Sequence, residues 1–195
     1  PEDQNRYSEK MLPVTNFFLP GIVFLYQGQE IGMRDNPKQS IQGFVDKPTF
    51  AIYDRLIAEG KTDAEALEQI NRESREHSRT PMQWDDSENA GFTTGKPWFR
   101  LSERYQEINV KKPLEKNDSV FYYYKDLIRL RHGEELLTEG DYQLLLPEDE
   151  KIFAYLRTSD KEQWIVVANL SEDTVSTEGL VKLSLIHISE PTRPY

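Results

Sequence analysis

The apolar positions at the start of the chain follow a helical spacing and then form a strand-like run. In residues 5–18 they recur every three to four positions, which predicts a helix that Pro13 either kinks or shortens. Pro20 and Gly21 break this pattern, and residues 22–26 are continuously apolar. Such a run is typical of a strand buried on both faces of a parallel sheet. Because a polar loop follows the strand, the order of elements predicts an α/β fold.

Two shorter helices are expected next, over residues 49–59 and 64–75. Gly60 is expected to end the first helix, and Thr62 or Asp63 to cap the second. The residues expected to face the interior are Phe50, Tyr53 and Ile57 in the first helix and Ala66, Leu67 and Ile70 in the second. Each helix would then present one apolar face to a core.

Residues 76–101 combine loop-forming residues with large aromatic side chains. Gly, Pro, Asn, Ser and Thr are frequent, yet Trp84, Phe92, Trp98 and Phe99 lie in the same stretch. A plain linker does not carry that many aromatic side chains, and long structured loops in compact domains are usually functional. We therefore expect a structured, functional loop here.

A strong helix is predicted over residues 120–132, capped by residues 117–119 and ended by Gly133. The residues expected on its core-facing side are Phe121, Tyr124, Leu127, Ile128 and Arg131. Its carboxyl-terminal end is basic, which suits the negative end of the helix dipole.

The pattern after this helix changes to short strands. Strand-like segments lie at residues 141–146, 152–157 and 164–170, and short polar turns separate them. Short spacing and turn signals indicate antiparallel pairing. A domain boundary is expected within residues 134–140.

Composition narrows the class of function. The 195 residues carry a formal net charge of −10, with 37% hydrophobic and 11% aromatic residues and no cysteine. The apolar share is sufficient for a core, which argues against wholesale disorder. The acidic balance argues against a nucleic-acid or anionic-membrane partner, since phosphates require a basic face. The absence of cysteine excludes disulfide scaffolds and thiol catalysis, and no apolar run approaches the ~20 residues of a membrane span.

Few residues carry chemistry that spacing alone identifies. The sequence has no phosphate-binding glycine loop and no His pair at metal spacing, so we expect neither a cofactor nor a metal ion. Glu30 directly follows the expected strand, where it is either a site carboxylate or a structural hydrogen-bond acceptor near a barrel rim. Arg75 and Arg79 border the aromatic loop. They either bind sugar hydroxyls or a carboxylate, or form ion pairs that lock the loop.

Four motifs together point to one enzyme family. They are YQGQEIGM at 26–33, SREHSRTPMQWDDSENAGFTTGKPW at 74–98, YQEINV at 105–110 and SVFYYYKDLIRLR at 119–131. In these motifs the chain resembles bacterial α-glucosidases of glycoside hydrolase family 13, the group that holds oligo-1,6-glucosidase, dextran glucosidase and trehalose-6-phosphate hydrolase. The resemblance implies an α/β fold, the last part of a (β/α)8 TIM barrel followed by the start of a carboxyl-terminal antiparallel β-domain.

The resemblance also implies how the chain is divided. Residues 1–135 correspond to the carboxyl-terminal part of the catalytic barrel, from its seventh helix to its eighth helix, and residues 136–182 to a truncated β-domain. Residues 183–195, LSLIHISEPTRPY, are similar to a translated sequencing adapter and are interpreted as an artefact. Because the chain begins with Pro1 rather than Met, its true amino terminus is expected to be missing.

The resemblance implies which residues act and which do not. Family members retain configuration through an aspartate nucleophile, a glutamate acid/base and an aspartate that stabilises the transition state. All three are expected upstream of Pro1, so we expect no catalytic residue in this chain. Arg75 matches the first Arg of the family motif Arg-Asp-Asn-Ala-Arg-Thr-Pro, which binds the non-reducing glucose, and Glu30 is a weaker candidate for substrate binding. Arg79 matches the more structural second Arg.

The chain departs from the family at two places. Glu76 and His77 replace the usual Asp-Asn of the arginine motif, which changes the hydrogen bonds behind it. Asp46, Lys47 and Pro48 stand where the family often has Asp-Ile-Glu or Asp-Val-Glu, whose Glu contacts the next sugar. The second departure bears on linkage preference.

The expected parent activity is that of a cytoplasmic, retaining, exo-acting α-glucosidase that cleaves α-1,6 bonds in short oligosaccharides. The chain by itself is expected to be inactive and poorly stable, since a barrel strand without neighbours leaves its edges unpaired. Three alternatives stay open: a trehalose-6-phosphate hydrolase, an α-glucosidase of α-1,4 or sucrose-type linkage, and a catalytically dead sugar-binding homologue. The expected partner is a small glucoside, with no nucleic acid and no membrane.

Overall fold

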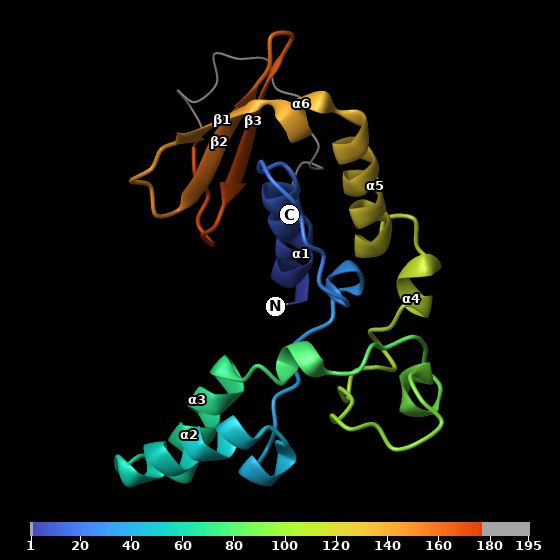
Figure 1. The fold of residues 1–195 in the computed structure, drawn as a ribbon, viewed down its shortest axis with the longest axis vertical. Coiled ribbons are helices and arrows are strands. Elements are labelled where there is room, and N and C mark those ends of the chain that lie inside the picture. Colours follow the sequence, from blue (N-terminus) through green and yellow to red (C-terminus); the bar gives the residue numbers. More distant parts are fainter. Residues whose placement is uncertain (1, 177–195) are drawn as a thin grey trace. The chain divides into compact units, whose positions relative to one another are not determined.

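The computed structural model describes residues 2–176, with side chains from residue 9 onward, and it divides into two compact units (Figure 1). One unit is the continuous stretch Leu25–Tyr122. The other joins residues 2–24 to residues 123–176 among those described. The interpretation of residues 183–195 as an adapter lies outside the described residues.

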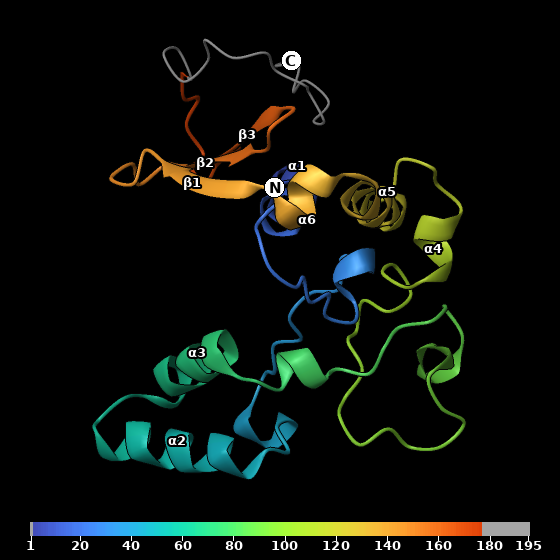
Figure 2. The same ribbon diagram turned by 45° about the horizontal axis from the view of Figure 1, so that its top comes forward.

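The discontinuous unit packs helices against a small antiparallel sheet (Figure 2). Its helices are α1 (Glu2–Phe17), most of α5 (Val120–Gly133) and α6 (Glu135–Glu139), and its strands are β1 (Asp141–Leu145), β2 (Ile152–Thr158) and β3 (Gln163–Asn169). The strands pair in the order β1-β2-β3, and α1 packs against β3 while α6 packs against β2. All three predicted strands and their antiparallel pairing are thereby confirmed.

The central strand β2 connects the sheet to α1. Its register places Ala154 opposite Leu145 of β1 and opposite Val167 of β3. Tyr155 of the same strand is fully buried and donates from its hydroxyl to the carbonyl of Thr15 at 2.7 Å. Burial raises the pKa of the Tyr155 phenol, so the hydroxyl stays a donor.

Arg131 of α5 binds carbonyls at the end of α1 and in the segment that follows it. Its Nη1 donates to the carbonyls of Phe17 and Leu19, and its Nη2 donates to that of Gly21 at 2.5 Å. The last carbonyls of a helix have no partner inside the helix, so a buried end needs such donors. The predicted core face of α5 is confirmed for Tyr124, Leu127 and Arg131, which are buried, whereas Ile128 is exposed.

The continuous unit is built on a pair of helices and a long loop. Its helices are α2 (Lys47–Ala58), α3 (Asp63–Glu73) and α4 (Lys111–Leu114), and its 3-10 turns are Gln29–Ile31, Ile41–Gly43, His77–Arg79 and Glu88–Gly91. The core cluster between α2 and α3 consists of Ile41, Phe44, Leu56, Ala66 and Ile70, with Tyr53 and Leu67 packed against it. The predicted cap of α3 is confirmed, because the Thr62 hydroxyl accepts from the Glu65 amide and the Glu65 carboxylate accepts from the Thr62 amide.

The face of α2 that packs against the core differs from the predicted face, and the prediction was wrong there. Thr49 and Leu56 are buried with Tyr53 beside them, whereas Phe50 and Ile57 are exposed. Both stripes contain Tyr53 and both have helical spacing, so periodicity alone does not separate them. The contact with α3 selects the stripe of Leu56.

The predicted strand over residues 22–26 is also wrong. The segment pairs with no strand among the described residues, and Ile22 and Phe24 are 84% and 83% exposed. A strand of a parallel sheet requires partners on its edges, and the described part of the chain holds one sheet, which is β1–β3. Residues 22–26 therefore keep their apolar side chains but lack, within the described part of the chain, the neighbouring strands that would bury them.

The aromatic loop is structured, as predicted. The Trp84 amide donates to the carbonyl of Ala90 at 2.9 Å, and the Val110 amide donates to that of the buried Gln83 at 2.9 Å. Ala90 is buried with a φ of 55°, a left-handed conformation that costs energy for a residue other than glycine. The two tryptophans of the loop, Trp84 and Trp98, are both exposed to solvent.

Candidate active-site cavity

A cavity of about 340 Å³ brings together two sequence motifs that are far apart in the chain. Tyr26, Gly28 and Met33 line it from the YQG segment, and Arg75 and Ser78 line it from the segment that follows α3. The Tyr26 hydroxyl donates to the Ser78 carbonyl and so fastens the two segments. The structure thus places Arg75 beside the residues that follow the apolar run.

The YQG turn depends on a glycine and on Glu30. Gly28 is buried at a φ of +94°, and a Cβ there would lie 2.6 Å from the sulfur of Met33. The Gly28 amide donates to the Glu30 carboxylate at 2.7 Å. Glu30 thereby closes the turn as a local acceptor, and it is not among the residues that line the cavity.

Arg75 is held by a carboxylate that sequence reasoning had not paired with it. Its Nε and Nη2 both donate to Asp46, the second bond measuring 2.9 Å to Oδ1, and Arg79 donates from Nη1 to the same carboxylate at 3.1 Å. The Asp46 side chain is 12% exposed while that of Arg75 is 57% exposed. The hydrogen bonds from Arg75 hold the pKa of Asp46 below its usual range, with Arg79 adding to the effect, and Asp46 in turn raises the pKa of Arg75.

The two residues that replace Asp-Asn in the arginine motif serve as internal anchors. Glu76 is 4% exposed, and its Oε1 accepts from the amides of Val45 at 2.8 Å and Asp46 at 2.6 Å. His77 accepts from the Asn36 amide at Nδ1, and its Nε2 lies 2.6 Å from the Asn71 carbonyl. Because a carbonyl only accepts, the proton of His77 belongs on Nε2.

A buried lysine lies close to Glu76. Burial lowers the pKa of Lys38, whereas the negative charge of Glu76 acts in the opposite direction. The backbone of Lys38 is fixed by Asn71, whose side-chain oxygen accepts from the Lys38 amide at 2.7 Å and whose side-chain nitrogen donates to the Lys38 carbonyl at 2.8 Å. The Asn71 side chain therefore ties the segment around Lys38 to α3.

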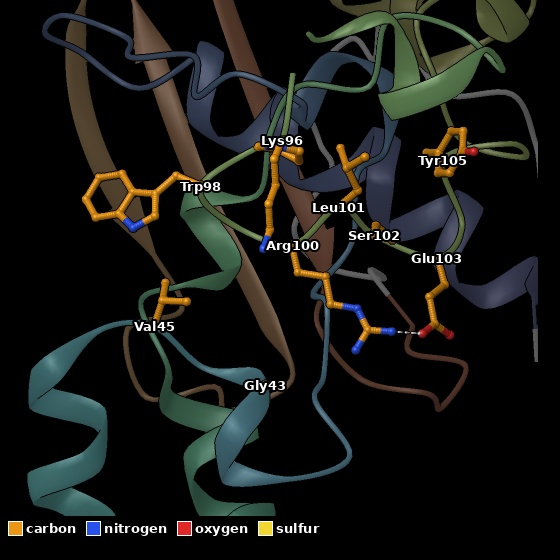
Figure 3. Close-up of a pocket in the computed structure, with 10 residues that line it drawn as sticks. Gly43, Val45, Lys96, Trp98, Arg100, Leu101, Ser102, Glu103 and Tyr105 are labelled. Carbon is orange, nitrogen blue, oxygen red and sulfur yellow. Dashed lines mark hydrogen bonds and ion pairs between the residues drawn. The ribbon is translucent and has the colours of Figure 1, made fainter. Parts of the chain in front are cut away.

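A second cavity, of about 400 Å³, opens at the aromatic loop (Figure 3). Trp98, 80% exposed, and Lys96 border it, and Arg100 donates to Glu103 at its rim. Val45 also lines it, directly before Asp46 in the chain. An exposed Trp among polar side chains offers a sugar a stacking face and hydrogen-bond partners.

A metal cluster and a membrane-spanning helix each place requirements on the described residues. No group of three or more His, Cys, Asp or Glu side chains within residues 2–176 is arranged to hold a metal ion. No described helix combines the length and apolar character that a membrane crossing requires.

The chain matches two protein families and is similar in sequence to known glucosidases. Residues 2–140 match the family described as "Alpha amylase, catalytic domain", and residues 142–182 match "Maltogenic Amylase, C-terminal domain". The oligo-1,6-glucosidase of Heyndrickxia coagulans is 45% identical over 81% of this chain and 29% of its own length. The chain therefore spans about three tenths of this relative.

Two solved structures share the fold. The trehalose-6-phosphate hydrolase of Bacillus licheniformis has a TM-score of 0.81 at 38% identity, over 90% of this chain and 33% of that one. The isomaltulose synthase of Klebsiella sp. LX3 has a TM-score of 0.81 at 39% identity, over 86% of this chain and 30% of that one. These likenesses confirm the expected fold class, the last part of a (β/α)8 barrel followed by antiparallel strands.

Proposed function

This chain belongs to the alpha-amylase catalytic-domain family, and we propose that it forms the carboxyl-terminal part of a cytoplasmic, exo-acting α-glucosidase that cleaves α-1,6 bonds in short oligosaccharides. The 45% identity to an oligo-1,6-glucosidase supports this substrate class. The observation that carries the proposal is the position of Arg75, which lines a cavity beside the YQG segment while a carboxylate holds it from behind.

Arg75 is proposed to bind the terminal glucose. Of the five N–H groups of a guanidinium, two are given to Asp46, which leaves three for a ligand. These donors suit the hydroxyl oxygens of a sugar, and their fixed plane selects its orientation. By binding the non-reducing end, Arg75 would favour exo-acting cleavage, which releases one glucose at a time.

The reacting carboxylates are proposed to come from the part of the protein that precedes this chain. A retaining glycosidase requires a nucleophile and an acid/base that are about 5 Å apart across the scissile bond. We assign neither role to a carboxylate of this chain, so the isolated chain should release no glucose from isomaltose. Determining the coding sequence upstream of residue 1 tests this directly, and three missing carboxylates there would favour a non-catalytic sugar-binding homologue.

Trehalose-6-phosphate hydrolase is the second candidate. Arg34 and Arg72 line the same cavity as Arg75, and clustered arginines suit a phosphate group. Relatives with this name are 38% identical to the chain, for example in Bacillus subtilis. An α-glucosidase acting on α-1,4 or sucrose-type linkages is the remaining alternative.

A chimeric enzyme tests the proposal. In this chimera, our chain replaces the matching segment of the Heyndrickxia coagulans oligo-1,6-glucosidase, which supplies the rest of the barrel. We expect it to hydrolyse isomaltose faster than maltose or trehalose-6-phosphate, with glucose released in the α configuration. A chimera that is folded by circular dichroism but does not hydrolyse isomaltose contradicts the proposal. A preference for trehalose-6-phosphate that the unaltered host lacks favours the second candidate.

A further inference from the structure

We propose that Asp46 is the positioning residue that sets the orientation of Arg75 toward the sugar, and that Glu76 fixes Asp46. This inference rests on the proposed function of Arg75 as a substrate-binding residue. It adds two residues, neither of which touches the substrate, to the machinery of the cavity.

The carboxylate of Asp46 binds arginine side chains and does not cap its own helix. Asp46 occupies the N-cap position of α2, where a carboxylate ordinarily accepts from the free amides of the first helical turn, yet its side chain makes no capping bond. Pro48 lies in that turn and has no amide hydrogen to offer. The carboxylate instead accepts from two arginine side chains, so the position favours arginine binding over helix capping.

Two hydrogen bonds join the Arg75 guanidinium to the Asp46 carboxylate. Arg75 approaches through Nε and Nη2, the side-on edge of the guanidinium, and both carboxylate oxygens of Asp46 accept from it. Two parallel bonds fix the plane of the guanidinium as well as its position. Nη1 takes no part in this pair, and Arg75 lines the cavity. Arg79 donates to Oδ2 as well, which holds the carboxylate in a single rotamer.

The backbone of Asp46 is itself anchored by Glu76. The buried Glu76 accepts from the Asp46 amide at 2.6 Å and from the Val45 amide at 2.8 Å. Charge-assisted bonds to two successive amides hold the backbone at the start of α2. Glu76 directly follows Arg75 in the chain. Arg75 and Asp46 are therefore connected in two ways, by the hydrogen bonds between their side chains and by the bond from the Asp46 amide to the Glu76 carboxylate.

A double-mutant cycle in the chimera tests the inference. The variants are Asp46→Asn, Arg75→Ala and both together, and the control is Asp54→Asn, an exposed carboxylate on the same helix. We expect Asp46→Asn to raise the KM for isomaltose about tenfold with a smaller change in kcat, and Asp54→Asn to leave both unchanged. The combined variant should have the KM of Arg75→Ala alone, because Asp46 acts through Arg75.

Two outcomes separate this inference from the proposed function. If Arg75→Ala leaves KM unchanged, the substrate role of Arg75 fails. If Arg75→Ala raises KM but Asp46→Asn does not, or if the two effects are additive, only the positioning role fails. Glu76→Gln keeps an acceptor oxygen and should hold KM near that of the chimera, whereas Glu76→Ala should raise it. A purely structural Glu76 would lower the unfolding midpoint in both variants without moving KM.

Discussion

Nη1 of Arg157 donates to the carbonyl of Phe18 at 2.6 Å, and through this bond the central strand of the sheet holds the end of the first helix. The guanidinium is fully buried, and its other partners are the carbonyls of Leu137, Gly140 and Asp141. Burial lowers the pKa of Arg157 because removing the charged guanidinium from water costs free energy. The four carbonyl acceptors offset part of this cost by hydrogen bonding to the guanidinium. One side chain thereby joins α1, α6 and β1.

Replacing Arg157 with Met should destabilise the discontinuous unit strongly. The variant keeps the length of the side chain but leaves several buried carbonyls without a donor, and we expect a loss of about 3 kcal/mol in the free energy of unfolding. Urea titration followed by circular dichroism, with hydrogen exchange of the β2 amides, measures the loss. Arg129→Met is the matched control, since the Arg129 side chain is 82% exposed. Equal effects at both positions would contradict the role of Arg157.

Gly140 should not tolerate a methyl group. A Cβ at this position would lie 2.4 Å from the carbonyl oxygen of Leu136 and 2.9 Å from that of Thr158, so the backbone would have to move. We expect Gly140→Ala to cost about 2 kcal/mol in the free energy of unfolding. Gly133→Ala is the control, because a Cβ there meets nothing within 4 Å and should leave stability unchanged or raise it slightly. Thermal unfolding of the two variants provides the comparison.

The local elements were largely predictable from sequence because short-range rules determine them. Thr62 and Glu65 have capping-box spacing, and Tyr124 and Leu127 recur at helical spacing on the buried side of α5. The strand expected over residues 22–26 failed because a parallel strand depends on partners that no local pattern supplies. Leu56 was missed for a related reason, since tertiary contact with α3 chose between two equally apolar stripes.

The candidate site was predictable only in part. Arg75 was singled out by its motif, and the structure shows the ion pair with Asp46 and a place in the cavity lining, while its role in sugar binding stays a prediction. Asp46 was noted only as part of a departing motif, because 29 residues separate it from Arg75 and no spacing rule joins them. Glu76 likewise looked like a substitution, and only the structure shows its bonds to the start of α2.

Tyr123 should titrate late in alkaline solution. Burial raises its pKa to about 12, above the ordinary value of about 10 for a tyrosine. The unfolded chain releases this proton first, so stability present below pH ~10 should decline as the pH rises toward 12. Absorbance at 295 nm, compared with that of Tyr123→Phe, measures the late-titrating phenol. A difference spectrum with its midpoint at the ordinary value would show that the phenol is solvated.

The unpaired apolar segment should promote self-association of the isolated chain. Ile22 and Phe24 are exposed and lie in an apolar stretch that pairs with no strand of the described residues, a combination that favours pairing between chains. We expect Ile22→Lys with Phe24→Lys to shift the protein toward monomer in light scattering after size exclusion. Leu170→Lys removes an exposed apolar side chain elsewhere and should have a smaller effect. The expectation fails if the two substitutions act alike.

The most direct test of the account is the KM for isomaltose of Arg75→Lys in the chimera. Lysine keeps the charge of Arg75 but loses the planar fork that binds Asp46 through two nitrogens and leaves further donors for a sugar. We predict a KM raised by about tenfold or more, with the unfolding midpoint close to that of the chimera. An unchanged KM would contradict it, because the guanidinium geometry would then have no part in binding the sugar.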